Sequence, residues 1–208
     1  MNQTRIDTSL QALARQDSDI ARAFAELGSP PPRTRPTGFR TFLNIIVSQQ
    51  LSTESAAAIM GRTEALLTAQ GTQPLQASCV DTHSDEALRA AGLSFRKIEY
   101  IRGLAQAVNT GQLDIDGLAD LPDDEAIAAI TQLKGFGRWS AEIYLMFALG
   151  REDIFPAEDL AVVTALGKLK RLDGKPTAKD ARAMTAHWAP YRSAGALFLW
   201  MYYRGAPV

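Results

Sequence analysis

The chain has only one cysteine, Cys79, among its 208 residues. A single thiol excludes an internal disulfide, a four-thiolate zinc site and an iron–sulfur cluster. The sequence also lacks an apolar run close to the roughly 18–20 residues of a membrane-spanning helix, and its polar N-terminus has no signal-peptide core. We therefore expect an intracellular, cytoplasmic protein that has no membrane partner and none of these metal sites.

The sequence also lacks an excess of either charge, since the formal net charge is −1. Taken alone, that value argues against a nucleic-acid partner. The charges are unevenly distributed, however: residues 105–130 carry six acidic and no basic residues, whereas residues 160–208 carry eight basic and two acidic ones. A neutral total can therefore conceal a basic face. Scattered, solvated charge is the alternative.

Strand-like alternation of apolar and polar residues is missing, and nearly every segment has helical periodicity. The pattern predicts an all-α fold, a two-lobed helical bundle of about ten helices. A break at residues 49–52 interrupts one long helical stretch, and Thr53 is the predicted N-cap of the helix that follows. The predicted helical stretches are 9–28, 38–67 in two parts, 84–91, 94–111, 121–133, 138–149, 160–172, 177–189 and 191–204.

The stretch LKGFGRWSAE, residues 133–142, places two glycines one residue apart between two predicted helices. Gly135 and Gly137 can adopt a positive φ and let another backbone approach closely. The amides of such a hairpin and of the next helix N-terminus form an anion site, for which a DNA phosphate is a good candidate. A plain glycine-containing turn between helices is the alternative.

A short loop follows the next predicted helix and runs into IFPAEDLAVV, residues 154–163. Pro156 disfavours helix in the residue before it, and Asp159 stands where the next helix should begin. Aspartate is a common N-cap, so capping alone is the structural alternative for Asp159.

Residues 133–162, taken together, resemble the signature of the helix-hairpin-helix superfamily of DNA glycosylases, with its hairpin, its glycine-proline/aspartate loop and its catalytic aspartate. Three other stretches resemble the alkylpurine branch, the 3-methyladenine DNA glycosylases: NIIVSQQLSTESAAAI (44–59), GLSFRKIEYIRGLA (92–105) and PYRSAGALFLW (190–200). The resemblance covers roughly residues 38–204. It implies a glycosylase fold over residues 38–208, with two lobes and an active site in the cleft between them. Residues 1–37 would form an N-terminal helix and a proline-rich connection that pack on this fold.

The reaction that the resemblance implies is hydrolysis of the N-glycosidic bond of an alkylated purine. Asp159 would be the catalytic carboxylate, which stabilises positive charge that develops on the deoxyribose. Glu158 is the rival one residue earlier. Relatives that also nick the DNA strand have a nucleophilic lysine where this chain has Trp139. We therefore expect base removal without strand cleavage.

The resemblance also implies an aromatic base pocket. Trp139 and Trp200 would stack on the cationic base, and packing in the core is the alternative for each. Tyr144 lies one position after a pocket tyrosine of a related enzyme, and Ile143 aligns with that tyrosine. We therefore expect an incomplete aromatic pocket, formed by Trp139, Trp200 and Tyr144.

A damaged base inside a duplex must be flipped out, and a side chain must fill the gap. The break in SQQLST matches the intercalating loop of the family, with Gln50 at the plugging position and Leu51 beside it. A polar loop with a buried Leu51 is the alternative. The DNA-binding hairpin itself would consist of Gly135, Phe136, Gly137 and Arg138.

The resemblance implies no required cofactor. A structural Na⁺ or K⁺ can bind main-chain oxygens of this hairpin in the family, and here these would belong to Thr131, Leu133 and Phe136. The two histidines, His83 and His187, are isolated in the sequence and are expected to be surface or packing residues. The expected partner is double-stranded DNA that contains alkylated bases, and we expect a monomer. A non-catalytic DNA-binding module, or a glycosylase for another damaged or mismatched base, is the alternative.

Overall fold

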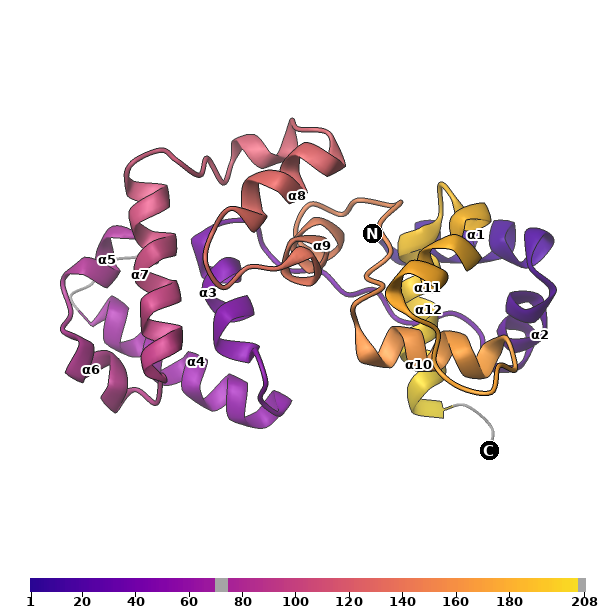
Figure 1. The fold of residues 1–208 in the computed structure, drawn as a ribbon, viewed down its shortest axis with the longest axis horizontal. Helices are drawn as coiled ribbons and strands as arrows, with labels where there is room; N and C mark the ends of the chain where they lie inside the picture. Colours follow the sequence, from indigo (N-terminus) through magenta and orange to yellow (C-terminus); the bar gives the residue numbers. More distant parts are fainter. Residues whose placement is uncertain (70–74, 206–208) are drawn as a thin grey trace. The chain divides into compact units, whose positions relative to one another are not determined.

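The computed structural model describes residues 1–69 and 75–205, and all regular structure in this part of the chain is helical (Figure 1). It contains twelve α-helices and two short 3-10 helices, so the prediction of an all-α fold is confirmed. In chain order the helices are α1 (Gln3–Gln16), α2 (Ser18–Leu27), α3 (Phe39–Ser48), α4 (Thr53–Thr68), α5 (Ser78–Asp81), α6 (Asp85–Ala90), α7 (Phe95–Asn109), η1 (Gly117–Ala119), α8 (Asp123–Thr131), α9 (Arg138–Phe147), α10 (Leu160–Leu169), α11 (Ala178–Met184), η2 (Ala186–Trp188) and α12 (Arg192–Gly205).

The chain divides into two compact units. Unit 1 combines Met1–Arg35 with Leu145–Val208, and unit 2 is Pro36–Tyr144. The second boundary falls inside α9, so this helix belongs to both units. The sequence predicted a different division, in which residues 38–208 form the glycosylase fold and residues 1–37 pack on it. It stays a prediction, as does the predicted position of the active site.

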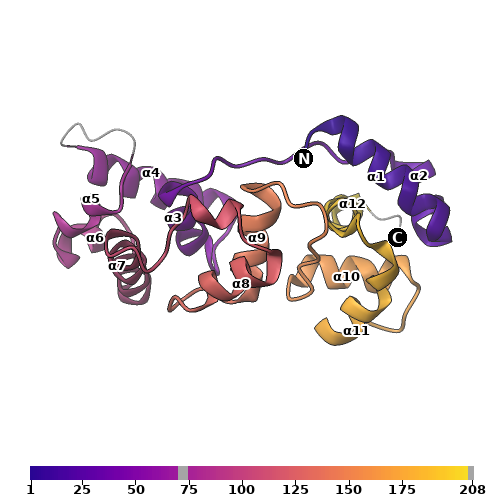
Figure 2. The same ribbon diagram turned by 90° about the horizontal axis from the view of Figure 1, so that it is seen from above.

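Unit 1 is organised around α12. Seven consecutive residues of this helix, from Ser193 to Leu199, are buried, because other helices of the unit cover it on several sides. Helices α1 and α10 both pack on α12, and Figure 2 shows α12 between them. Trp188 of η2 is fully buried beside this helix, where its ring would clash with a Cβ at Gly195.

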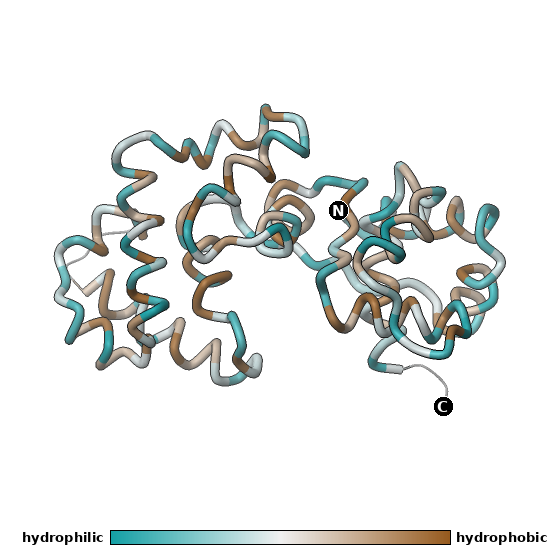
Figure 3. Tube along the Cα trace, in the orientation of Figure 1, coloured by the Kyte–Doolittle hydropathy of each residue, from teal (hydrophilic) through white to brown (hydrophobic). Residues whose placement is uncertain are grey.

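Unit 2 is organised around α3 and α7. Seven of the ten residues of α3 are buried, and α3 packs on α4 and α7. The short helices α5 and α6 also pack on α7. Hydrophobic and hydrophilic residues alternate along the helices in Figure 3, as expected for helices with one buried face.

The helix predicted over residues 9–28 is in fact two helices, because the chain breaks at Asp17. Asp17 has extended backbone angles (φ −137°, ψ 108°), and its Oδ1 accepts hydrogen bonds from the amides of Asp19 and Ile20 at 3.1 and 3.3 Å. Its carboxylate also accepts a hydrogen bond from Lys170 Nζ, at 2.6 Å, and one from Trp188 Nε1, at 2.7 Å. The buried partners of Asp17 thus favour a new helix start over a continuous helix.

Several helix ends differ from the prediction, and two of them have a clear local cause. Ser52, not Thr53, is the N-cap of α4, since its Oγ accepts a hydrogen bond from the Ser55 amide at 3.2 Å. Helix α9 ends at Phe147 rather than at residue 149. Gly150 there adopts a left-handed conformation (φ 70°), and the Arg151 amide donates to the Leu145 carbonyl at 3.0 Å. This arrangement closes a helix C-terminus and stops its extension.

Within residues 1–69 and 75–205, none of the helices combines the length and the hydrophobicity that are needed to span a bilayer. The same residues contain no group of three or more His, Cys, Asp or Glu side chains that is placed to hold a metal ion.

Candidate functional site

The hairpin between α8 and α9 is a tight turn. The Leu133 amide donates to the Ile130 carbonyl, and the Phe136 amide donates to the Leu133 carbonyl, each at 3.1 Å. Gly135 has a φ of 92°, and a Cβ at this position would lie 2.3 Å from the ring of Tyr100. Both the backbone conformation and the packing therefore require glycine at position 135.

Gly137 does not share the conformation of Gly135. Its φ is not positive, and a Cβ there would meet nothing within 4 Å, so of the two glycines only Gly135 uses the left-handed conformation that glycine permits. Gly137 is exposed and directly precedes α9, and its carbonyl accepts the Ala141 amide at 3.2 Å. Helix α9 begins directly after Gly137, and the amides in the first turn of a helix point outward from its N-terminal end. Gly137 itself places no side chain at this end of α9.

The other two hairpin residues have different roles. Phe136 is buried and lies edge-on to Phe42 of α3, with ring centroids 5.6 Å apart. Phe136 thus anchors the hairpin in unit 2. Arg138 donates from Nε to Glu142 Oε1 at 2.9 Å and lies 4.0 Å from Asp124. Its guanidinium is half-exposed beside these two carboxylates, which reduces the positive charge that it offers to a phosphate.

The loop between α3 and α4 contains the predicted plugging residues. Gln50 is exposed and has a φ of 57°, which is unusual for a residue other than glycine. Leu51 is 39% exposed, so the alternative of a buried Leu51 is wrong. Gln49, which the sequence did not single out, donates from Nε2 to the Gly135 carbonyl at 2.8 Å. A side-chain hydrogen bond therefore ties this loop to the hairpin.

Asp159 is the N-cap of α10, at the predicted start of the helix. Its Oδ1 accepts hydrogen bonds from the amides of Ala161 and Val162 at 3.0 and 3.1 Å. The same oxygen accepts a hydrogen bond from Trp200 Nε1 at 3.1 Å. Capping thus explains part of the geometry of Asp159, but the bond to the indole of Trp200 is additional to it.

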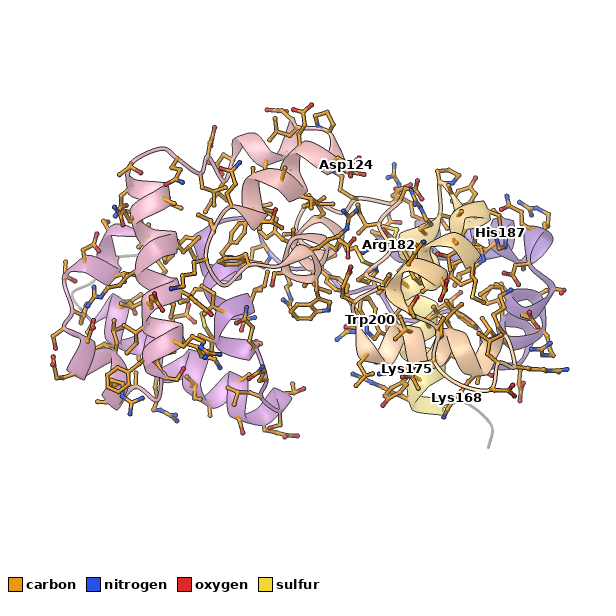
Figure 4. All side chains as sticks on the ribbon, viewed as in Figure 1. Asp124, Lys168, Lys175, Arg182, His187 and Trp200 are labelled. Carbon is orange, nitrogen blue, oxygen red and sulfur yellow. The ribbon has the colours of Figure 1, made fainter. Side chains whose placement is uncertain are left out.

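The loop before Asp159 is held by side chains from α11 and α12. Arg182 donates to the Phe155 carbonyl at 2.8 Å and to both carboxylate oxygens of Glu158, at 2.8 and 2.6 Å. Ser193 Oγ accepts a hydrogen bond from the Ile154 amide at 3.0 Å. Figure 4 labels Arg182 and Trp200, which approach this loop from α11 and α12. Glu158, the rival carboxylate, is therefore paired with a guanidinium, whereas Asp159 is paired with an indole.

The three predicted pocket aromatics have different surroundings. Trp200 is half-buried, and its ring centroid is 5.6 Å from that of Phe147. Trp139 is half-buried at the second residue of α9. Tyr144 is fully buried in unit 2, where its ring stacks on Phe42 at 4.1 Å.

The hydroxyl of Tyr144 accepts a hydrogen bond from the Gly38 amide at 3.3 Å, and burial raises the pKa of this phenol. With both its ring and its hydroxyl engaged inside unit 2, Tyr144 presents no exposed face to a base in this structure. Its predicted place in the pocket has no support in this geometry.

The HhH-GPD model, which describes a superfamily of base excision DNA repair proteins, matches residues 43–190. The chain belongs to this superfamily. DNA-3-methyladenine glycosylase 1 of Schizosaccharomyces pombe is 34% identical over 163 residues, which are 78% of this chain and 71% of that protein.

Two solved structures extend the comparison within the HhH-GPD superfamily. The 3-methyladenine DNA glycosylase (Mag1) of S. pombe, in complex with abasic DNA, has a TM-score of 0.85 and 29% identity. The match covers 96% of this chain and 98% of that one. The DNA-3-methyladenine glycosidase of Bacillus halodurans has a TM-score of 0.82 and 34% identity, and the match covers 94% and 88% of the two chains.

The expected cation ligands of the HhH-GPD hairpin are main-chain oxygens at the end of α8 and in the turn that follows. Leu133 supplies an oxygen that already accepts one hydrogen bond, from Phe136, and a carbonyl oxygen has a second lone pair. The Thr131 hydroxyl donates to the Ile127 carbonyl at 2.9 Å, and the main-chain oxygen of Thr131 is the expected ligand. These neutral oxygens fit a hard monovalent cation in chemical type.

Proposed function

We propose that the protein is a monofunctional DNA glycosylase that removes alkylated purines, such as 3-methyladenine and 7-methylguanine, from double-stranded DNA. The names of the three relatives described above support this proposal, since each is at least 29% identical and matches most of the chain. The observation that carries it is the hydrogen bond between Trp200 Nε1 and Asp159 Oδ1, at 3.1 Å. Simple capping of α10 does not need this bond, whereas a carboxylate that must face a sugar does need a fixed orientation.

Asp159 supplies the charge that the reaction needs. As the N-glycosidic bond stretches, positive charge develops on the deoxyribose, and a nearby carboxylate stabilises it. Three hydrogen bonds to Oδ1 hold the side chain before the substrate arrives. An alkylated purine carries its own positive charge and leaves readily, so the site needs little acid catalysis.

Trp139 and Trp200 would stack on the extruded base. An indole attracts a cationic purine through its π-face, with an energy of about 1–2 kcal/mol when the contact is desolvated. Trp139 has no amine and cannot form a Schiff base with the sugar. The proposed enzyme therefore removes the base and leaves the strand intact.

The hairpin and the plugging loop would bind the DNA itself. Amides at the start of α9 suit a phosphate, and the exposed Gly137 allows a backbone to come close. Gln50 and Leu51 are exposed and would fill the gap that the flipped nucleotide leaves. A Na⁺ or K⁺ on the oxygens of Thr131, Leu133 and Phe136 would stabilise the hairpin next to the phosphate. We propose that one copy of the chain is sufficient for this activity.

The test is mass-spectrometric identification of the bases released from methylated duplex DNA. The wild-type protein should release 3-methyladenine and 7-methylguanine, and Asp159→Asn should release them at least about 100-fold more slowly. Glu158→Gln is the matched control and should retain most of the activity. Undiminished release by Asp159→Asn would refute the catalytic assignment, and binding without any release would favour a non-catalytic DNA-binding module.

The absence of strand cleavage needs a separate measurement. Sodium borohydride traps a Schiff base as a covalent enzyme–DNA adduct. No adduct should form during base release. A trapped adduct would refute a monofunctional mechanism. If the protein released only an oxidised or mismatched base from DNA that contains one, it would instead be a glycosylase for another damaged or mismatched base.

A further inference from the structure

The proline-rich segment between α2 and α3 carries two arginines that lie against Phe147, the last residue of α9. The guanidinium carbons of Arg33 and Arg35 are 5.6 and 5.8 Å from the centroid of the Phe147 ring. The Arg35 amide also donates a 2.8 Å hydrogen bond to the Phe147 carbonyl. The backbone of this segment is therefore held at Phe147, and both charges lie at the same ring.

Phe147 connects these charges to the catalytic carboxylate. Its ring centroid is 5.6 Å from that of Trp200, and Trp200 donates its indole N–H to Asp159. All these residues belong to unit 1. Two positive charges thus lie one aromatic layer away from the tryptophan that orients Asp159.

Arg33 and Arg35 differ in their partners from seven of the other fourteen arginines. These seven form ion pairs with carboxylates: Arg5, Arg22, Arg40, Arg102, Arg138, Arg182 and Arg192. Among the described residues, neither Arg33 nor Arg35 has a carboxylate within ion-pair distance. Neither guanidinium on this ring is therefore paired directly with a carboxylate, and Asp159 attracts Arg33 only from beyond ion-pair distance.

The electrostatics of the cluster favour an anion. Partial loss of water and repulsion from Arg204 lower the pKa of Arg33, and the attraction of Asp159 offsets this only in part. Burial and repulsion from Arg33 lower the pKa of Arg35. Arg33 thus disfavours the charged form of Arg35, and Arg204 disfavours the charged form of Arg33. An anion between them would remove this cost and would accept their N–H groups in the fork geometry that phosphate suits.

The positive charge of Arg33 and Arg35 conflicts with the proposed reaction unless an anion neutralises it. The proposed substrate is a cationic purine, and uncompensated positive charges near Asp159 would oppose its binding and the charge on the sugar. A bound phosphodiester would neutralise them. We propose that Arg33 and Arg35 bind a phosphate that flanks the nucleotide whose base is removed, so that the guanidiniums are neutralised only when a DNA strand is correctly seated. This inference rests on the proposed function.

The test uses a duplex with a tetrahydrofuran abasic analogue, which binds without requiring any chemistry. Each phosphate within three positions of the analogue is replaced, one at a time, by a neutral methylphosphonate. Affinity is measured by fluorescence anisotropy for the wild type and for the Arg33→Gln/Arg35→Gln double variant. One methylphosphonate position should weaken wild-type binding by about tenfold.

The double variant should bind the unmodified duplex about tenfold more weakly than the wild type, and the same methylphosphonate should weaken it no further. Arg33→Lys, which retains the charge, should remain sensitive to that methylphosphonate. Arg22→Gln removes an arginine that is already paired with Asp19 and is the matched control. Thermal unfolding of each variant checks that it is folded.

The inference is wrong if the double variant and the methylphosphonate weaken affinity independently, so that their losses multiply. It is also wrong if the double variant binds within twofold of the wild type, or if no methylphosphonate position weakens wild-type binding. Base release from a duplex with one 7-methylguanine is measured separately. A wild type that releases no base refutes the proposed function, even if the phosphate coupling is present. A wild type that releases base without the coupling refutes only the phosphate site.

Discussion

The side-chain amide of Gln49 donates a 2.8 Å hydrogen bond to the carbonyl oxygen of Gly135. The two residues are 86 positions apart in the chain, and each belongs to a different element of the proposed DNA-binding surface in unit 2. Lys97 of α7 donates from Nζ to the Val47 carbonyl at 2.7 Å, which ties α7 to the end of α3 just before Gln49. The plugging loop and the hairpin are thus fixed to one another before DNA binds.

Gln49→Ala should loosen this connection. A hydrogen bond between partly buried groups contributes about 1 kcal/mol, so the free energy of unfolding should fall by about that amount. Affinity for a duplex with an abasic analogue should also fall, because the loop and the hairpin would no longer be held in one geometry. Urea unfolding and fluorescence anisotropy measure the two effects. Unchanged affinity would mean that the bond serves stability alone.

Gln50→Gly should separate stability from function. Gln50 has a φ of 57°, where glycine is not strained, so the substitution should raise the free energy of unfolding by about 0.5–1 kcal/mol. The same change removes the proposed plug and should slow base release under single-turnover conditions. A more stable protein with undiminished release would show that Gln50 does not fill the gap in the duplex.

The two hairpin glycines should respond differently to alanine. Gly135→Ala places a Cβ 2.3 Å from the Tyr100 ring at a positive φ and should lower the free energy of unfolding by about 2 kcal/mol. Gly137→Ala meets open space and should leave stability nearly unchanged while it weakens DNA binding. Urea unfolding and anisotropy on both variants check this. If both substitutions changed the free energy of unfolding equally, the different structural roles of Gly135 and Gly137 would be contradicted.

Trp200→Phe should retain an aromatic face and remove the hydrogen bond to Asp159. If the indole orients the carboxylate, kcat for base release should fall by about tenfold with a smaller change in KM. In the Asp159→Asn background the same substitution should cost much less, because the two residues act together. A loss confined to KM would assign Trp200 to base binding alone.

Local chemistry in the sequence predicted the hairpin and the start of α10 because glycine, proline and aspartate act on their own backbone. Gly135 and Asp159 are where that chemistry placed them. The partners of these residues were not predictable in the same way. Nothing in the pair Gln49–Gln50 indicates which side chain turns inward to the hairpin, and the burial of Tyr144 depends on Phe42, about 100 residues earlier.

The Arg33 and Arg35 cluster was missed for the same reason. The proline-rich composition of residues 29–38 correctly indicated a connection without helix. It could not show that this connection lies on Phe147, since that contact joins parts of the chain more than 100 residues apart. The break at Asp17 was missed because the apolar periodicity continues across it, while its cause is a lysine at position 170.

Asp17→Asn should reveal a pH-dependent contribution to the stability of unit 1. Burial alone would raise the pKa of Asp17, but hydrogen bonds from Lys170 and Trp188 and the charge of Lys170 lower it from 3.8 to about 2. A carboxyl whose pKa is lower in the folded state stabilises the fold above its unfolded pKa. This contribution is about 2 kcal/mol and is lost as the pH falls from about 4 to about 2.

The wild type should therefore be clearly more stable than Asp17→Asn at pH 7, and the difference should shrink by about 2 kcal/mol as the pH approaches 2. Urea unfolding at a series of pH values measures it. Asp19→Asn is the matched control, because Asp19 is a weaker and more exposed partner of Lys170, at 3.2 Å. A stability difference for Asp17→Asn that is constant from pH 7 to pH 2 would show that packing around the side chain, rather than its charge, ties α2 to Lys170.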